Sequence, residues 1–314
     1  MRLLLIAFIM SLMTTISYAR DQIKIVGSST VYPFSTVVAE RFGKSGKFKT
    51  PVIESTGTGG GMKLFCAGIG VNTPDMSNAS RKIKTKEIKL CKDNGVTEIT
   101  QVIVGLDGIA FTSSVQGKQY NFTKKQLWEA MSSLGSKPTK WSDIDPSLPD
   151  YKIAILTPPA TSGTRDAWNS LVMKKGCPEE ILKEQGKKAC YLLREDGPVI
   201  EVGENDTLII NKLVGEPSYF GIFGFSYYDN SKDKVQAHLI EDVKISLKSI
   251  QDGSYPISRP LYFYVKDQHI GVIPGIDKFV KEFTSKKAAG PRGYLLDLGL
   301  VPLKSLKESI SKVE

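Results

Sequence analysis

Short β-type segments alternate with amphipathic helical segments along most of the chain, and this alternation limits the folds that the chain can adopt. Strands are expected at residues 22–26, 51–54, 75–77 and 153–156. Helices are expected at residues 33–42, 62–67, 85–91, 123–131, 162–173, 276–283 and 292–298. Alternation of this kind is typical of an α/β fold with a mainly parallel sheet.

Two apolar stretches are candidates for crossings between domains. Residues 97–111 form a long apolar run that is interrupted by Gly105, Asp107 and Gly108, and such a run can leave one domain and enter another. Residues 256–265 form a second apolar strand late in the chain, and we expect them to make the return crossing. The length of 314 residues also fits roughly two domains.

The first residues have the parts of a secretory signal peptide. Arg2 supplies the positive charge, residues 3–13 form a short apolar run, and Ser17 and Ala19 are the small residues of a cleavage site. The apolar run is too short to span a bilayer, and no cysteine beside the cleavage site would carry a lipid. We expect cleavage after Ala19, which removes residues 1–19 and leaves a soluble periplasmic protein. A buried N-terminal helix is the alternative.

Four cysteines, an even number, occur in this chain that we expect to be exported: Cys66, Cys91, Cys177 and Cys190. Such a set favours disulfides. Pairing in sequence order, Cys66 with Cys91 and Cys177 with Cys190, closes the shortest loops, and we predict this pairing, although the sequence alone permits three connectivities. Metal binding is the rival hypothesis, but no CxxC pair or histidine cluster supports it, and we expect no metal.

The chain is basic, with 42 Lys and Arg against 33 Asp and Glu and a formal net charge of +9. Such a balance is compatible with nucleic acid, a membrane surface or a small anion as partner. The lysines are scattered, with local runs such as residues 82–86, and do not form an arginine-rich arm. We therefore expect a solvated positive surface that attracts an anionic ligand, and no nucleic-acid partner.

Four short segments combine glycine, serine and threonine where a predicted strand ends and a helix begins. They are Gly27-Ser28-Ser29-Thr30, Thr56-Gly57-Thr58-Gly59-Gly60-Gly61, Asn78-Ala79-Ser80-Arg81 and Thr161-Ser162-Gly163-Thr164-Arg165. A helix N-terminus offers free N–H groups and the positive end of its dipole, and hydroxyls and guanidinium groups add further donors. Such turns gather at the carboxyl ends of the strands in an open α/β sheet, so together they predict an oxyanion site.

Each of these segments also has an ordinary explanation, because serine or threonine before a helix is most often just an N-cap. No Gly-Lys-Ser/Thr follows a spaced glycine, so there is no Walker phosphate loop, and the glycines of residues 57–61 do not form a dinucleotide fingerprint. Four such segments in one chain, two of them ending in arginine, nevertheless favour an anion site over four unrelated caps.

With these segments in this order, the chain resembles the phosphate-binding proteins of phosphate-specific ABC transporters. Gly27 to Pro33 matches the first loop of that family, Thr58 to Lys63 the second, Ser80-Arg81 the third, and Ser162 to Arg165 the fourth. Phe220 to Gly224, and the terminal segments Gly293-Tyr294 and Val301-Pro302, are similar as well. The match covers nearly the whole mature chain.

The resemblance implies a two-lobed periplasmic-binding-protein fold of type II, in which each lobe is a mainly parallel sheet flanked by helices and the ligand lies in the cleft between the lobes. With the two crossings, it implies one lobe of residues 20–107 and 258–314 and a second lobe of residues 108–257. The implied function is high-affinity binding of inorganic phosphate in the periplasm and its delivery, by hinge closure, to the membrane permease of an ABC transporter. We expect a monomer without cofactor or catalysis.

The resemblance also implies a set of phosphate ligands, carried over position by position from the four loops. The implied set is Ser29, Thr30, the Val31 amide, Thr58, Ser80, Arg81, Ser162, Gly163, Thr164 and Arg165. One branch of the family has aspartate where Arg81 stands here, and arginine where Pro158 stands. The cations are therefore expected at Arg81 and Arg165, as in another branch.

Because aspartate is absent from the third loop, the resemblance leaves open which residue accepts the proton of monohydrogen phosphate. Asp107, in the first crossing, is the first candidate, and a hinge or capping role is its alternative. Glu54 and Asp75 come next.

Two rival functions remain open at this stage. One is a binding protein for another oxyanion, such as sulfate, molybdate, tungstate or a phosphonate. The other is an enzyme, namely a histidine-free phosphatase, because His238 and His269 are the only histidines and neither lies in a catalytic motif.

Overall fold

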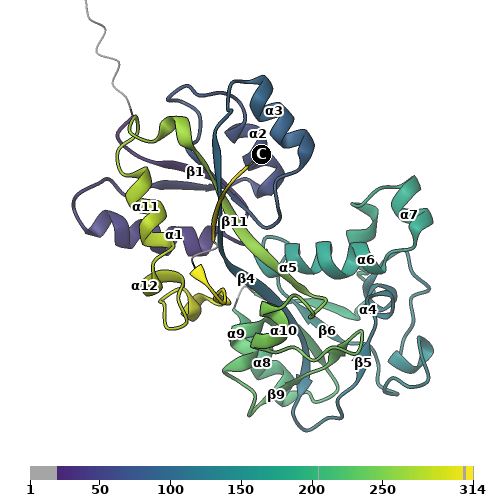
Figure 1. Cartoon of the computed structure of the whole chain (residues 1–314). Helices are drawn as coiled ribbons and strands as arrows, with labels where there is room; N and C mark the ends of the chain where they lie inside the picture. Colours follow the sequence, from purple (N-terminus) through teal and green to yellow (C-terminus); the bar gives the residue numbers. More distant parts are fainter. Residues whose placement is uncertain (1–19, 204, 307–308, 314) are drawn as a thin grey trace, which may run out of the picture.

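Two long antiparallel strands, β4 (Ile99–Ser114) and β11 (Ser258–Lys266), run side by side between the two lobes of the protein (Figure 1). In this computed structural model, residues 20–203, 205–306 and 309–313 are described. The predicted signal peptide, residues 1–19, and its cleavage site lie outside the described residues. The β4–β11 pairing ends where Ser258 lies opposite Gly108, and from Ile109 onward β4 pairs with strands of the second lobe instead.

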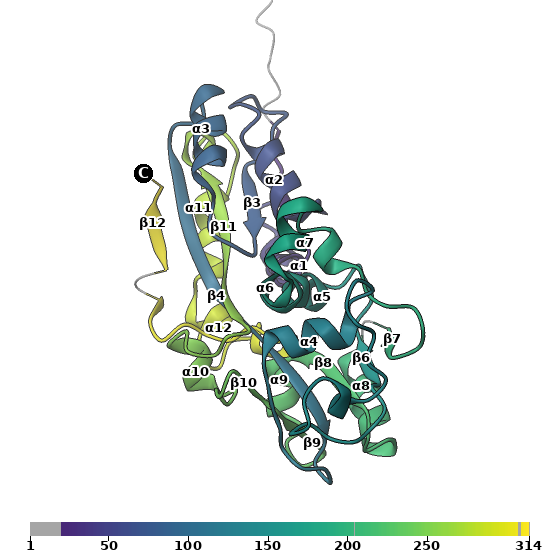
Figure 2. The same cartoon turned by 90° about the vertical axis from the view of Figure 1, so that its right-hand side faces the viewer.

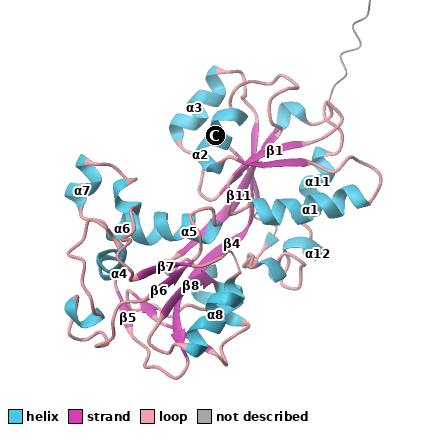
Figure 3. Ribbon diagram, turned by 180° about the vertical axis from the view of Figure 1, so that it is seen from behind, coloured by secondary structure: helices cyan, strands magenta, loops and turns pink. Residues whose placement is uncertain are grey.

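The first lobe is built on a sheet with the strand order β2-β1-β3-β11-β4, and β12 pairs with the outer side of β4. Its strands besides β4 and β11 are β1 (Lys24–Gly27), β2 (Val52–Ser55), β3 (Met76–Ala79) and β12 (Ile310–Lys312). Its helices are α1 (Tyr32–Lys44), α2 (Gly57–Phe65), α3 (Thr85–Asp93), α11 (Ile276–Phe283) and α12 (Lys286–Ala289). Helices α1 and α11 cover one face of this sheet, while α2 and α3 cover the other (Figures 1 and 3).

The second lobe continues the sheet from β4 in the order β4-β8-β6-β7, with β9 also pairing with β4. Its strands are β5 (Asn121–Phe122), β6 (Ile155–Thr157), β7 (Val199–Glu201), β8 (Phe220–Gly224), β9 (Val235–Ala237) and β10 (Leu239–Ile240). Its helices are α4 (Lys124–Met131), α5 (Gly163–Trp168), α6 (Lys174–Gly176), α7 (Glu179–Glu184), α8 (Asp206–Gly215), α9 (Phe225–Asp229) and α10 (Leu247–Gln251). A single π-helical turn joins α5 to α6.

Each lobe has its own hydrophobic core. The second-lobe core is aromatic: Phe111 of β4 lies 5.3 Å from the ring of Phe220 and 5.7 Å from that of Trp168. The first-lobe core between the sheet, α1 and α11 includes Val38 and Phe279. Figure 2 shows β4 passing from one lobe to the other as one continuous strand.

The predicted α/β, two-lobed fold is confirmed, with one refinement of the sheet. Its outer strands are parallel, because β1 pairs in parallel with β2 and β3, and β6 with β7 and β8. The crossing strands β4 and β11 are antiparallel to each other, and each is antiparallel to its next neighbour, so the sheet is mixed.

Two predicted boundaries are wrong. The glycine-rich stretch 57–61 is not a loop before the helix but the first turns of α2. A Cβ on Gly61 would lie 2.4 Å from the Cα of Gly27, so glycine is retained where this helix touches the end of β1. The helix expected at residues 292–298 is limited to a short 3₁₀ turn at Leu296–Leu298, which ends at Gly299 with a φ of +100°.

Candidate functional site

The larger of two cavities beside the strand ends measures about 650 Å³ and lies between the lobes. First-lobe residues that line it follow β1, β2 and β3 in the chain, as the predicted oxyanion site requires. They include Ser28, Ser29, residues 56–60, Ser80 and Arg81. The flank of the helical segment α5–α6 forms the opposite wall with Asp166, Ser170, Leu171 and Lys174. Neutral hydroxyls and helix N-termini therefore converge on one open space.

Thr58 and Ser80 hold two of these segments together. The Thr58 hydroxyl oxygen accepts a hydrogen bond from the Ser80 backbone N–H at 3.1 Å and lies 3.2 Å from the Ser80 hydroxyl oxygen. The second and third predicted loops thus form one unit. Ser80 is buried, so an anion that it contacts would be shielded from water.

A smaller cavity of about 250 Å³ is lined by the fourth predicted segment and by part of the first. Ser162 is the N-cap of α5, and its hydroxyl accepts a hydrogen bond from the Thr164 N–H at 3.2 Å. Gly163, Thr30 and Asp107 line the same cavity, and Ser29 lines both cavities. Ser29 therefore lies where the two spaces adjoin.

The lobes touch each other at Thr30 and Gly163. The Thr30 hydroxyl donates to the Gly163 carbonyl at 3.2 Å, although these residues are 133 positions apart. A Cβ on Gly163 would lie 2.5 Å from the Cα of Thr30, so only glycine permits this approach. The first and fourth predicted loops are in direct contact.

Arg259 is the central cation of the cleft, and it is absent from the ligand set predicted from the sequence. Its side chain is 9% exposed, and its guanidinium donates to the Thr30 hydroxyl at 3.0 Å and to the Ser170 hydroxyl at 3.3 Å. It also lies 3.4 Å from a carboxylate oxygen of Asp107 and 3.7 Å from one of Asp166. The only sequence signal was its place near the start of the predicted return strand.

Asp107 is Arg259's cross-strand partner in the β4–β11 ladder. Burial raises the pKa of the Asp107 carboxyl above its ordinary value, although the positive charge of Arg259 opposes this shift. A carboxyl group of this kind takes up a proton more readily than an exposed aspartate. Asp107 is therefore a buried carboxyl group with a raised pKa beside the central cation of the cleft.

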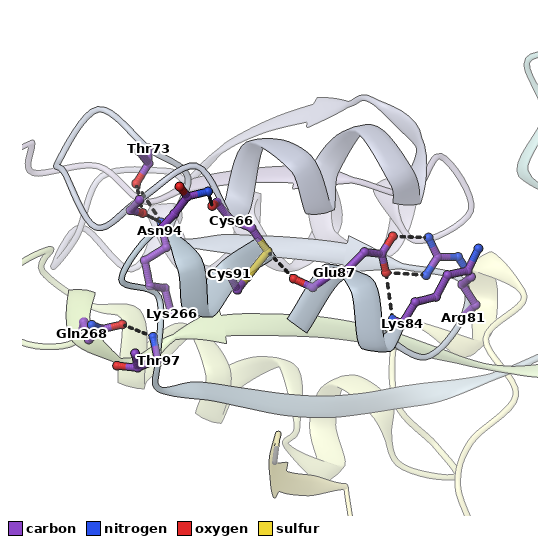
Figure 4. The surroundings of a disulfide bond; sticks show 11 residues. Cys66, Thr73, Arg81, Lys84, Glu87, Cys91, Asn94, Thr97, Lys266 and Gln268 are labelled. Carbon is purple, nitrogen blue, oxygen red and sulfur yellow. Dashed lines mark hydrogen bonds and ion pairs between the residues drawn. A yellow bond between two sulfur atoms is a disulfide. The ribbon is translucent and has the colours of Figure 1, made fainter. Parts of the chain in front are cut away.

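Arg81 lines the larger cavity and is held by Glu87 of α3 (Figure 4). The two guanidinium nitrogens donate to the two carboxylate oxygens at 2.9 and 2.7 Å. Burial alone would raise the pKa of Glu87, but the hydrogen bonds from Arg81 and the Lys84 N–H outweigh it and lower that pKa. This fork positions the Arg81 side chain at the cavity wall.

Arg165 is not brought into either cavity wall. Its buried guanidinium donates to the Pro158 carbonyl at 3.2 Å and lies 3.8 Å from Glu201. Burial lowers the pKa of Arg165, and the charge of Glu201 opposes this. Val31, the N-cap residue of α1, has a fully buried side chain and lines neither cavity.

The two weaker candidates for the proton acceptor lie elsewhere. Asp75 is buried between Arg20, at 2.8 Å, and His269, at 2.6 Å. Glu54 forms an exposed ion pair with Lys24 at 3.2 Å. Among the described residues, no group of three His, Cys, Asp or Glu side chains is arranged to hold a metal ion.

Both predicted disulfides are present. Cys66–Cys91 joins the C-terminal end of α2 to α3 (Figure 4), and Cys177–Cys190 joins the end of α6 to the turn that carries Tyr191. Each bond therefore fixes a segment that contributes to the cavity wall. In the described part of the chain, no helix has the length and apolar character needed to cross a membrane.

Comparison with known families decides which group of proteins has this architecture. A family model described as the PBP superfamily domain matches residues 14–287. The chain belongs to the PBP superfamily. Its PBP relatives include the phosphate-binding protein PstS of Staphylococcus saprophyticus, which is 30% identical over 301 residues, 93% of this chain and 84% of that protein. Protein SphX of Synechococcus elongatus is 30% identical over 77% of this chain and 67% of its own length.

Solved PBP structures have the same fold as this chain. A possible phosphate-binding protein from Planctomyces limnophilus superposes with a TM-score of 0.75 and 27% identity, over 91% of this chain and 95% of that one. PstS from Borrelia burgdorferi has a TM-score of 0.65 at 19% identity, over 91% of this chain and 100% of that chain, and supports the fold alone.

Proposed function

We propose that this PBP-superfamily protein binds inorganic phosphate in the cleft between its lobes. The observation that carries the proposal is the convergence of Ser29, Thr58 and Ser80 with two guanidinium groups on one cavity, because phosphate is recognised by many hydrogen-bond donors and a fork of positive charge. The relatives named phosphate-binding protein support it.

The proposed ligand set keeps most residues of the four loops. It consists of Ser29, Thr30, the Val31 amide, Thr58, Ser80, Arg81, Ser162, Gly163 and Thr164, with Arg259 added. Arg165 takes a supporting part, since its guanidinium holds the Pro158 carbonyl in front of α5. Asp107 is the proposed acceptor of the phosphate proton, because it lines the smaller cavity and contacts Arg259.

Hinge closure is the proposed mechanism, with residues 20–107 and 258–314 as one lobe and residues 108–257 as the other. The change of strand partners at Gly108 and Ile109 supports these boundaries. A ligand shifts such an equilibrium only by its differential affinity for the closed state. Contacts from both lobes to one ion, such as those of Ser80 and Ser162, would provide that difference.

The protein is proposed to act as a monomer in the periplasm after removal of residues 1–19, and to deliver phosphate to the permease of an ABC transporter. The apolar run and small residues before Arg20 support export. We propose no catalytic activity, and the relatives named phosphate-binding protein support this. The two histidines have structural roles, because the buried His238 hydrogen-bonds Tyr120 and Ser113, and His269 hydrogen-bonds Asp75.

Calorimetric titration with phosphate, arsenate, sulfate, molybdate, tungstate and a phosphonate tests the proposal. Phosphate and arsenate should bind, and micromolar affinity corresponds to about −8 kcal/mol. Sulfate at about a thousandfold excess should not compete, because a buried proton acceptor finds no proton on sulfate. Competition by sulfate would overturn the phosphate assignment. Release of product from a chromogenic phosphate ester would instead reveal an enzyme.

A further inference from the structure

Lysines from both lobes line the larger cavity. Lys84, which directly precedes α3, comes from the first lobe, while Lys174 and Lys187 come from the second. Within the described part of the chain, none of these three ammonium groups forms an ion pair with a carboxylate. The larger cavity thus contains cations that form no ion pair with a protein carboxylate.

Lys84 and Lys187 are close enough for their charges to interact across the cleft. The positive charge of Arg81, together with burial, lowers the pKa of Lys84, although the negative charge of Glu87 opposes this shift. The charge of Lys187 from the opposite lobe lowers the same pKa. Like charges that face each other across a cleft raise the free energy of the empty closed state. An anion between them would remove that penalty.

Burial distinguishes an inner and an outer part of the cavity. The inner part contains the buried Ser80 and the nearly buried Arg259. The outer part contains Lys84 and Lys187, which are exposed, and Lys174, which is half-buried. Arg81, held by Glu87, lies beside Lys84 between these parts (Figure 4). Positive groups therefore extend from the interior of the cleft to its mouth.

The cavity is also large for a single orthophosphate ion. Its volume of about 650 Å³ falls within the range of about 300–1,000 Å³ that is typical of pockets for drug-sized ligands. Orthophosphate has one phosphorus and four oxygen atoms. Six of the lining side chains are cationic, whereas Asp166 is the single carboxylate among the lining residues. Both size and charge fit a longer and more highly charged anion.

We propose that Lys84, Lys174 and Lys187 form a second anion subsite at the mouth of the cleft, so that the cavity accepts a condensed inorganic phosphate chain. One phosphoryl group would lie at the inner hydroxyls and Arg259, and the next at the lysines. An organic phosphate ester fits less well, because its second half would need neutral partners where the wall presents ammonium groups. The inference rests on the proposed function for the inner group.

The test compares orthophosphate with tripolyphosphate by calorimetric titration of the full mature chain. The variant Lys84→Gln/Lys187→Gln removes one subsite cation from each lobe. The control variant Lys86→Gln/Lys188→Gln makes the same change of charge in the same two segments, at exposed lysines that do not line the cavity. Glycerol 3-phosphate serves as a ligand with one phosphoryl group and a neutral tail.

We expect the subsite variant to lose about tenfold in tripolyphosphate affinity, equivalent to about 1.4 kcal/mol, and less than about twofold in orthophosphate affinity. The control variant should lose less than about twofold for both ligands, and added salt should weaken tripolyphosphate binding more than orthophosphate binding. Wild-type protein that binds orthophosphate but not tripolyphosphate would overturn the subsite. Equal losses of affinity for both ligands in the subsite variant would overturn it too, as would tighter binding of glycerol 3-phosphate than of tripolyphosphate by the wild type. If orthophosphate itself fails to bind, the proposed function is wrong. The lysine subsite is then tested by the tripolyphosphate affinities of the wild type and the two variants.

Discussion

Arg259 and Asp107 face each other across the β4–β11 ladder, and their side chains meet 3.4 Å apart where the two lobes join. Both residues are placed by strands that cross between the lobes rather than by a loop. Arg259 reaches onward to the Thr30 hydroxyl at the start of the first helix. One ladder position thus brings a cation and a carboxyl group to the cleft.

Arg259→Ala should weaken phosphate binding by at least about 2 kcal/mol, because anionic oxygens in the cleft lose a charge-assisted donor. Arg259→Lys should recover only part of this, since an ammonium cannot span two oxygens as a guanidinium does. Calorimetric titration measures both losses.

Arg292→Ala is the matched control for this experiment, because Arg292 is exposed and lines neither cavity. Arg81→Ala should also weaken binding, whereas Arg165→Ala should have a smaller effect than Arg259→Ala. A larger loss for Arg165→Ala would show that the Arg165 guanidinium turns into the cleft when phosphate binds.

Asp107→Asn should reduce the discrimination between phosphate and sulfate while the fold stays intact. The buried carboxylate accepts a proton from phosphate but meets only lone pairs on sulfate, and asparagine, which can donate, removes that repulsion. Competition titrations measure the selectivity, and circular dichroism with thermal unfolding checks the fold. Unchanged selectivity would exclude Asp107 as the proton acceptor.

Gly163→Ala should weaken phosphate binding without unfolding either lobe. The added methyl group would lie 2.5 Å from the Thr30 Cα, so the lobes must separate or the N-terminus of α5 must shift. Gly203→Ala is the control, because a methyl group there meets no atom within 4 Å. Wild-type affinity in Gly163→Ala would mean that the Thr30–Gly163 contact is absent from the bound state.

Loss of either disulfide should lower the free energy of unfolding by about 2–4 kcal/mol. The separations of 25 residues for Cys66–Cys91 and 13 for Cys177–Cys190 place both loops in the range where cross-links restrict the unfolded chain. Urea unfolding of Cys66→Ala/Cys91→Ala and Cys177→Ala/Cys190→Ala measures the loss. Wild-type unfolding curves that do not respond to reductant would contradict the expectation.

His238 should make the protein less stable in acid. Burial lowers its pKa from 6.5 to about 3, and the Tyr120 N–H donates to its Nδ1, so the ring is neutral and its Nε2–H donates to Ser113. Above pH 6.5 neither state binds this proton. Between pH 6.5 and about 3 the unfolded state binds it and the folded state does not, so stability falls as the pH falls.

His238→Gln tests this contribution, because glutamine can accept from Tyr120 and donate to Ser113 without titrating. The wild type should lose about 1.4 kcal/mol more per pH unit than the variant over the middle of that window. Urea unfolding at several pH values measures the difference, and phosphate affinity at pH 7 should be the same. Parallel stability curves would show that the pKa of His238 is the same in the folded and the unfolded state.

The fold was largely predictable because strands, helices, caps and turns are determined mainly by residues that are close together in the sequence. The start of α5 at its Ser162 cap and the two crossing strands are examples. The helical conformation of residues 57–61 was not predictable, because glycine is a poor helix former. The close contact with Gly27 explains the glycine at position 61 alone.

The sequence predicts the hydroxyl groups that line the cavity of the candidate site, but not its central cation. Ser29, Thr58 and Ser80 follow strand ends that the sequence shows directly. Arg259 enters the site through the register of β11 against β4, a pairing between residues 152 positions apart that no local pattern reveals. Arg165 has a suitable place in the sequence, but its direction depends on the Pro158 carbonyl and Glu201.

The strand order of the first lobe has a consequence for biosynthesis. β11 lies between β3 and β4 in the sheet. The facing edges of β3 and β4 therefore stay unpaired until β11, near the end of the chain, has been synthesised. The second lobe draws β5 to β10 from one uninterrupted stretch and needs no such wait. Open edges are sites of aggregation, so a chain cut short before Ser258 would expose them permanently. The second lobe can therefore fold first, and the first-lobe sheet closes the gap between β3 and β4 only when β11 pairs with both strands.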